Sequence, residues 1–276
     1  MPTTIIHSNA LTTQQIQHIA QALGAEPETH ARHFRVQHKM LPPGTLDTLR
    51  EICQVDINTL PESFDTASVG LLITDMDSTL INIECVDEIA DFVGVKPQVS
   101  AITEAAMRGE LDFAASLKKR VALLEGLDVS ALQHVYDERL QLNPGAEMLI
   151  NGLKSRQINV ALVSGGFTFF TERLKQRLGL DFTLANVLTQ EKGKLSGTVD
   201  GAIIGAEAKA EYLQQLCEQL GITRQQVIAM GDGANDLQML GIAGLGVAYH
   251  AKPAVRAQAD VSIQFSGLDT VLDFLE

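Results

Sequence analysis

Residues 69–80 read VGLLITDMDSTL, and this stretch decides the expected fold. Its first six residues are mostly apolar, which is typical of a strand buried on both faces of a parallel sheet. Asp75 follows this predicted strand directly, and Asp77 comes two residues later. In open parallel sheets, ligands bind beyond the carboxyl ends of the strands. The sequence therefore predicts a functional site at Asp75 and Asp77.

After this strand the pattern is first helical and then alternating. Residues 86–140 have the apolar spacing of helices and contain no convincing strand. Beyond Asn143, predicted strands alternate with predicted helices. The strands are expected at residues 158–163, 182–187, 227–230, 245–248 and 261–265, with a hairpin turn at 192–194. This alternation indicates an α/β fold with a doubly wound parallel sheet, and the helical block is an insert after the first core strand.

The segment before the first core strand predicts a small separate domain. It contains candidate helices at 11–24 and 44–53, a candidate strand at 33–40, and a polar, turn-rich linker at 61–68. Three units are therefore expected. They are a small α+β N-terminal domain at 1–66, a core formed by 67–85 and 141–276, and a helical cap at 86–140.

The composition argues against several classes of partner. The net charge of −13 disfavours nucleic acid, because a phosphate backbone needs a basic face. No apolar run approaches the roughly 18 residues that span a bilayer, and residues 1–10 lack the features of a signal peptide. Three widely spaced cysteines indicate reduced thiols. We therefore expect a cytoplasmic protein with a small-molecule substrate and no nucleic acid or membrane partner, which could form a homodimer.

Polar clusters follow three of the predicted strands: Asp75 with Asp77, Ser-Gly-Gly at 164–166, and GDGAND at 231–236. Neighbouring carboxylates repel unless a cation lies between them, and Mg²⁺ prefers such oxygen ligands beside a phosphate. Small residues before a helix free backbone N–H groups to face an anion. Lys209, near the start of a predicted helix, could reach a phosphate oxygen. Each feature alone is commonly an ordinary turn or surface residue, but together they predict magnesium-dependent phosphoryl chemistry.

At these motifs the sequence resembles the haloacid dehalogenase superfamily and, within it, the phosphoserine phosphatase family. DMDSTL at 75–80 matches the DxDxT pattern, and the other clusters and Lys209 match the remaining motifs in order and spacing. The resemblance runs from about Val69 to the end of the chain. It implies a Rossmann-like core with a helical cap, and Mg²⁺-dependent hydrolysis of O-phospho-L-serine to L-serine and phosphate, the last step of serine biosynthesis.

The resemblance also implies roles for individual residues. Asp75 would be the nucleophile that forms an aspartyl-phosphate, and Asp77 would protonate the leaving group and then activate water. The implied Mg²⁺ ligands are Asp75, the backbone carbonyl of Asp77, and Asp232. The implied substrate-binding residues are Ser164, Gly165 and Lys209 for the phosphoryl group, Asn235 beside it, Glu84 for the ammonium group, Arg120 for the carboxylate, and Met107 and Phe113 for apolar contacts.

Other interpretations stay open at this point. A related phosphatase or phosphotransferase could act on phosphohomoserine or another small phosphate monoester. A signalling receiver also places acids at the ends of parallel strands, but it has no cap and needs no second acid two residues after the first. Some members of the family carry regulatory ACT-type domains at the N-terminus, and residues 1–66 could be a shortened relative of these.

Overall fold

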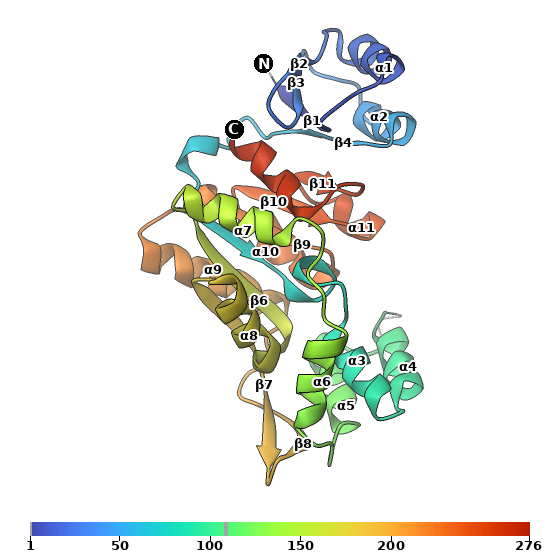
Figure 1. Ribbon diagram of the computed structural model, residues 1–276, viewed down its shortest axis with the longest axis vertical. Helices are drawn as coiled ribbons and strands as arrows, with labels where there is room; N and C mark the ends of the chain where they lie inside the picture. The colour runs from blue at the N-terminus through green and yellow to red at the C-terminus, as the bar shows by residue number, and fades with distance from the viewer. Residues whose placement is uncertain (1, 108–109) are drawn as a thin grey trace.

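A seven-stranded sheet forms the centre of the computed structural model, which describes residues 2–107 and 110–276 (Figure 1). The strand order is β11-β10-β9-β5-β6-β7-β8, and β8 alone runs antiparallel to its neighbour. The strands are β5 (Leu71–Thr74), β6 (Asn159–Phe167), β7 (Phe182–Glu191), β8 (Lys194–Asp200), β9 (Val227–Gly231), β10 (Leu245–Tyr249) and β11 (Val261–Ile263). The predicted doubly wound sheet is thus confirmed, with β5 between β6 and β9.

Alternate residues of β5 face opposite layers of helices, as the pleat of a strand requires. Leu72 belongs to the apolar cluster that includes residues of α7 (Ala146–Ser155) and α8 (Thr168–Leu178). Leu71 and Ile73 belong to the other cluster, together with residues of α9 (Ala206–Leu220) and α10 (Leu237–Ile242). All three side chains are fully buried. Helices therefore cover both faces, and α11 (Pro253–Arg256) connects β10 to β11.

Among the described residues, four helices form the predicted insert: α3 (Cys85–Phe92), α4 (Lys96–Met107), α5 (Phe113–Ala122) and α6 (Ser130–Glu138). The chain enters the cap near Ile81 and returns to the core near Leu142. These two residues form an antiparallel β-bridge. The cap also touches the hairpin of β7 and β8, because Leu195 N–H donates to Leu127 O at 2.8 Å. The cap is thus attached to the rest of the molecule at two places.

The N-terminal segment forms a second sheet of order β2-β3-β1-β4, in which each pair is antiparallel. Its elements are β1 (Thr3–His7), α1 (Thr13–Leu23), β2 (Glu28–Thr29), β3 (Phe34–Gln37), α2 (Thr45–Cys53) and β4 (Asp56–Thr59). This is the order of a split βαβ fold. In Figure 1 this blue layer lies beside the red C-terminal elements of the core.

Strand β4 meets the edge strand β11 through side chains. The buried Asp56 carboxylate accepts hydrogen bonds from the backbone N–H groups of residues 264, 265 and 266, at 2.7–3.1 Å. Asn58 both donates to Ser262 O and accepts from Ser262 N, each at 2.9 Å. Two side chains of β4 therefore satisfy backbone groups at this edge of the core sheet.

Several elements differ from the sequence-based expectation. Strands β1 and β4 and helix α7 were not predicted. The strand expected at 158–163 continues as β6 to Phe167, so residues 164–166 lie at the end of a strand and not in a loop. Among the described residues, no helix has both the length and the apolar character needed to cross a bilayer.

Candidate active site

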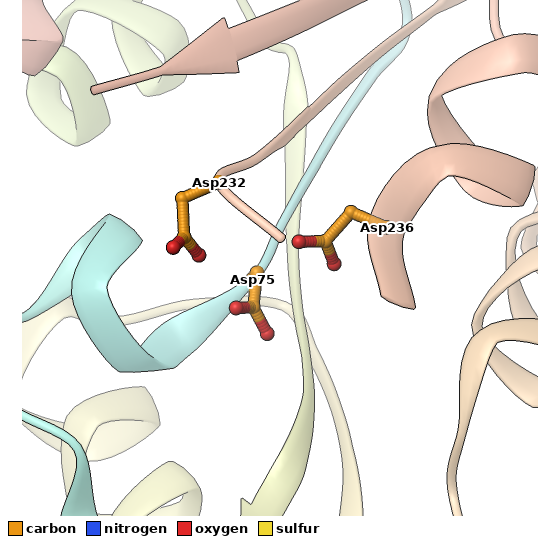
Figure 2. A group of neighbouring side chains, drawn as sticks. All are labelled: Asp75, Asp232 and Asp236. Carbon is orange, nitrogen blue, oxygen red and sulfur yellow. The ribbon is translucent and has the colours of Figure 1, made fainter. Parts of the chain in front are cut away.

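Three carboxylates converge at the carboxyl ends of β5 and β9. Asp75 follows β5, Asp232 follows β9, and Asp236 lies in the short turn after Asp232 (Figure 2). Each offers an oxygen atom, and these atoms all lie within 4.8 Å of one another. Such a group of hard oxygen donors fits a divalent cation. These three residues could therefore hold a metal ion.

Lys209 lies beneath this acidic group. It is fully buried in the second turn of α9, and its Nζ donates to Asp75 Oδ1 at 2.5 Å and to Asp236 Oδ1 at 2.7 Å. Burial opposes its charge, but Asp236 and Asp75 outweigh that effect and raise the pKa of Lys209. Lys209 thus remains a cation, and it offsets part of the repulsion between the two acids.

Burial dominates the ionisation of the acids themselves. It raises the pKa of Asp75 well above its usual range, because the charge of Lys209 compensates only in part and Asp236 and Asp77 add repulsion. Burial, followed by Asp236, raises the pKa of Asp232 to about 6. An added cation would favour the ionised forms of Asp75 and Asp232. The excess of negative charge that raises the pKa values of Asp75 and Asp232 is a second reason to expect a metal ion here.

Asp77 lies in a tight turn, Met76–Leu80, that directly follows Asp75. The turn contains Ser78 in the left-handed region, at φ +57°, and Asn143 Nδ2 donates to Thr79 O at 2.8 Å. Asp77 Oδ1 accepts from the backbone N–H of Cys85 at 3.0 Å, so its carboxylate points toward the cap and not into the acidic group. Burial raises the pKa of Asp77, although hydrogen bonds from Cys85 and Ser164 oppose this. The half-buried Asp77 therefore holds a proton more strongly than a solvent-exposed aspartate does.

Glu84 and Arg120 face the same pocket from the cap side. The pocket has a volume of about 520 Å³ and also contains Asp75 and Asp77. Glu84 is a solvent-exposed residue, but protein atoms surround much of its carboxyl group. That burial and then the neighbouring Asp77 raise the pKa of Glu84 to about 7, while a hydrogen bond from Ser78 at 2.8 Å opposes the shift. On its cap side, the pocket therefore carries the acid Glu84 and the arginine Arg120, opposite Asp75 and Asp77.

The glycines of the Ser-Gly-Gly segment allow close packing around the pocket. A Cβ atom on Gly165 would lie 2.7 Å from Cζ of Phe113, and a Cβ atom on Gly166 would lie 2.7 Å from Asp77 Oδ2. Ser164 is fully buried, and its Oγ accepts from the backbone N–H of Gly166 at 2.8 Å. A side chain at either glycine would thus displace Phe113 or Asp77.

The structure brings nearly all of the predicted site residues together. The pocket is lined by Asp75, Asp77, Glu84, Phe113, Arg120, Gly165, Asp232 and Asn235. Ser164 and Lys209 lie directly behind this lining. Met107 is the last residue of α4, and its side chain lies outside the part of the chain that the structure describes.

Three further polar lining residues were not singled out from the sequence: Thr103, Ser116 and Lys252. Ser116 lies one turn before Arg120 on α5, so helical spacing could have placed it on the same face. Lys252 lies three residues after β10, and the rule that ligands bind beyond strand ends could have identified it. Thr103 had no comparable signal.

The sequence model of the haloacid dehalogenase-like hydrolases matches residues 69–244, which include β5, the cap and β9. The chain belongs to this hydrolase family. A phosphoserine phosphatase from a Polaromonas species is 53% identical over 225 residues, covering 80% of this chain and 95% of that protein. The crystal structure of a probable phosphoserine phosphatase from Vibrio cholerae matches 99% of this chain and 86% of its own, with 36% identity and a TM-score of 0.86.

A third similarity concerns the chemistry of the site. A structure described as a phospho-aspartyl intermediate analogue of phosphoserine phosphatase is 41% identical to this chain, with a TM-score of 0.71. It covers 75% of this chain and 99% of its own length. The family and the fold implied by the sequence motifs are thus confirmed.

Proposed function

We propose that this protein is a phosphoserine phosphatase that hydrolyses O-phospho-L-serine to L-serine and phosphate. The observation that carries this proposal is a single pocket lined by two groups of residues, which we call its floor and its wall. The floor holds the acids Asp75 and Asp77 near Lys209, and the wall holds Glu84 and Arg120. The floor suits a phosphoryl group, and the wall suits an ammonium and a carboxylate. Phosphoserine carries all three groups.

Asp75 is the proposed nucleophile. One of its carboxylate oxygens attacks phosphorus, the bond from phosphorus to the serine oxygen breaks, and an aspartyl-phosphate forms. Asp77 gives its proton to the departing serine oxygen, and the raised pKa of Asp77 is consistent with that role as an acid. The Asp77 carboxylate then takes a proton from water, whose oxygen attacks phosphorus. The bond from phosphorus to Asp75 breaks, and inorganic phosphate leaves.

Mg²⁺ is the proposed metal. Asp75, Asp232 and the backbone carbonyl of Asp77 would hold it, and Asp236 would support the site. When bound, Mg²⁺ would neutralise charge on the phosphoryl oxygens. Lys209 already donates to Asp75 and Asp236, which places a fixed positive charge beside the reacting group. Ser164, Gly165 and Asn235 would complete the contacts to the phosphoryl group.

Substrate selection is assigned to the cap and to Glu84, which directly precedes α3. Arg120 Nε is buried and has no hydrogen-bond partner among the described residues, so a ligand carboxylate would satisfy it. Its planar fork suits bidentate binding of a carboxylate. Glu84 would bind the ammonium group, while Phe113 and Met107 would pack against the aliphatic part of the substrate. These contacts are absent for a phosphate ester that lacks amino and carboxylate groups.

The wider context of this function is also a proposal. The buried thiols of Cys53, Cys85 and Cys217 are free, which suits a reducing cytoplasm. Serine biosynthesis is the corresponding role. We assign catalysis to residues 67–85 and 141–276, closure over the substrate to the cap at 86–140, and no part in the chemistry to residues 1–66. The partner is the small-molecule substrate.

Turnover of phosphoserine tests the proposal directly. Purified protein should release phosphate from phosphoserine with Mg²⁺ and stop when a chelator removes the metal. Rates on phosphothreonine and phosphohomoserine should be much lower. Equal rates on all three esters would instead favour a broad phosphatase of small monoesters. A stable phosphorylated protein without continuing phosphate release would favour a signalling receiver.

Replacement of the nucleophile is a second test. In Asp75→Asn the amide cannot form the acyl-phosphate, so kcat should fall by at least about 10³-fold while the fold persists. Circular dichroism would check the fold, and single-turnover assays would check whether the aspartyl-phosphate still forms. Asp200→Asn changes an exposed acid on β8 in the same way and should retain full activity. Residual turnover near that of the wild type would refute the role of Asp75.

A further inference from the structure

The pairing of β6 with β7 is interrupted beside the active site. The parallel register holds from Ala161 to Val163, then shifts, and resumes where Phe167 lies opposite Asn186. Gly165 and Gly166 fall within this interruption. Two successive glycines have little intrinsic conformational preference, so the peptide between them needs another contact to fix its orientation. Neither glycine can be replaced to stiffen it, because a Cβ atom would meet Phe113 or Asp77.

The side chain of Asn186 supplies this contact. Its Nδ2 donates to Gly165 O at 2.8 Å, and its Oδ1 accepts from the backbone N–H of Ile204 at 2.9 Å. Asn186 is 1% exposed, and it does not line the pocket. Both of its polar atoms are therefore committed to the backbone of two different segments.

The first hydrogen bond acts on the hydroxyl group of Ser164. Because a peptide unit is planar and trans, fixing Gly165 O on one side directs the N–H of Gly166 to the opposite side. That N–H donates to Ser164 Oγ at 2.8 Å. A hydroxyl oxygen that accepts in this way keeps its own proton for an acceptor in the pocket. Asn186 thus determines, through one peptide, where the Ser164 hydroxyl donates.

The second hydrogen bond acts on the segment that leads into α9. Ile204 lies two residues before Ala206, the first residue of that helix, and Lys209 follows in its second turn. The backbone of this segment approaches the same glycine, because a Cβ atom on Gly165 would lie 3.5 Å from Ile204 O. Asn186 therefore fixes the spacing between the strand end that carries Ser164 and the helix that carries Lys209.

We infer that Asn186 is a positioning residue for phosphoryl binding, acting by joining the Ser164 and Lys209 segments into one rigid cradle. The inference rests on the proposed function, in which these two residues bind the phosphoryl group. Asn186 itself touches neither substrate nor metal. Its loss should weaken contacts to phosphate and leave contacts to the amino and carboxylate groups of serine intact.

Two variants and a matched control test this inference in the Mg²⁺-loaded protein. Asn186→Ala removes both hydrogen bonds, and Asn186→Asp keeps the shape and the acceptor but loses the donor to Gly165 O. Asn58→Ala removes an equally buried asparagine that donates to Ser262 O and accepts from Ser262 N and Arg50 Nη2 at the other end of the sheet. The readouts are thermal stability, inhibition by orthophosphate, inhibition by L-serine, and kcat/KM for phosphoserine and p-nitrophenyl phosphate.

Both Asn186 variants should weaken orthophosphate inhibition by about tenfold or more, the cost of losing one hydrogen bond in a buried site. Inhibition by L-serine should stay within about twofold, and kcat/KM should fall alike for both esters. Asn58→Ala should lower thermal stability without changing either inhibition constant. Unchanged orthophosphate inhibition, or an equal loss for orthophosphate and L-serine, would overturn the inference. So would failure of both Asn186 variants to fold, because the residue would then be purely structural.

The two proposals can fail separately. If the wild type does not hydrolyse phosphoserine but does hydrolyse p-nitrophenyl phosphate, the proposed substrate is wrong. The role of Asn186 is then still decided by p-nitrophenyl phosphate turnover and by orthophosphate inhibition.

Discussion

Arg120 carries a charge that no other described residue neutralises in an ion pair. Its buried Nε atom has no hydrogen-bond partner in the part of the chain that the structure describes. Burial lowers the pKa of Arg120, while Asp87, Glu84 and Asp77 oppose that change from a distance. A partly buried cation without a direct partner carries a desolvation cost, and a bound carboxylate would relieve that cost. Arg120 is therefore a suitable site for a ligand carboxylate.

Replacing this arginine should separate specificity from chemistry. Arg120→Ala should lower kcat/KM for phosphoserine by roughly 10- to 100-fold, the equivalent of one charge-assisted contact. Turnover of p-nitrophenyl phosphate, which has no carboxylate, should change little. Lys119→Ala removes the neighbouring exposed cation and should leave both rates unchanged. An equal loss on both esters would mean that Arg120 acts on the phosphoryl group or on the fold.

Glu84 should make substrate capture depend on pH. Its pKa is raised to about 7 by burial and by Asp77, and only the ionised form attracts an ammonium group. As the pH falls below about 7, Glu84 gains a proton, and kcat/KM for phosphoserine should decrease. Since kcat/KM reports the free enzyme, Glu84→Gln should remove this limb of the profile and lower the plateau. An unaltered profile in Glu84→Gln would assign the titration to another group.

The turn that precedes α7 packs tightly against a distant segment of the chain. Gly145 has φ +82°, and a Cβ atom there would lie 2.1 Å from Asp269 Oδ1 and 2.6 Å from its backbone nitrogen. Gly201 has a similar φ of +74° but no atom within 4 Å of such a Cβ. The two glycines share a left-handed backbone conformation that would strain any other residue, and they differ in how crowded a Cβ atom would be.

This pair gives a stability test at the scale of the element. Gly201→Ala should lower the free energy of unfolding by about 1 kcal/mol, the cost of a left-handed L-residue. Gly145→Ala should lower it by more than about 3 kcal/mol, because the collision is added to the strain. Urea unfolding of both variants would measure the difference. Equal losses would show that the turn moves away from Asp269 at little cost.

Elements with local signals could be predicted, and elements defined by distant partners could not. The apolar run before Asp75 and the helical spacing of residues 86–140 both predicted their elements correctly. Strand β4 reads DINT, and its Asp56 and Asn58 disfavour a strand unless they bond to another segment. Their partners lie more than 200 residues further along the chain. No local pattern could reveal that pairing.

The same distinction applies to the site. Acids at strand ends could be found from the sequence because topology alone brings strand ends together. The contact of Asp77 with the Cys85 N–H and the contacts of Asn186 depend on how loops close around the pocket. The roles of Glu84 and Arg120 came from the family resemblance, since a single acid and one member of a basic run have no signal of their own.

At the scale of the whole molecule, the N-terminal layer meets the end of the chain through buried polar groups. His7 Nδ1 lies 2.9 Å from Asp273 Oδ2, and Arg35 Nη2 donates to Asp273 O at 3.1 Å. His33 is also buried there, with Nδ1 3.5 Å from Glu276 Oε2. Burial lowers the pKa of His33 to about 4, although the charge of Asp273 opposes this. This contact should therefore respond to acid.

The sign of that response follows from linkage. The pKa of His33 is lower in the folded state than the value of about 6.5 for an unfolded chain, so unfolding takes up a proton between pH 6.5 and 4. The free energy of unfolding should fall over this range, by on the order of 1 kcal/mol between pH 7 and 5 from His33. His33→Gln should reduce this loss, whereas the same change at the exposed His134 should not. Urea unfolding at both pH values would decide.

The side chains of Asp56 and Asn58 also matter before the molecule is complete. Ribosomes synthesise a chain from its N-terminus to its C-terminus, and N-terminal domains generally fold first. The β4 side chains that saturate backbone groups beside β11 are therefore made about 200 residues before those groups. A newly finished sheet edge is a template for aggregation with other nascent chains. In this protein, β4 has already been synthesised when β11, the edge strand whose backbone groups it binds, is made.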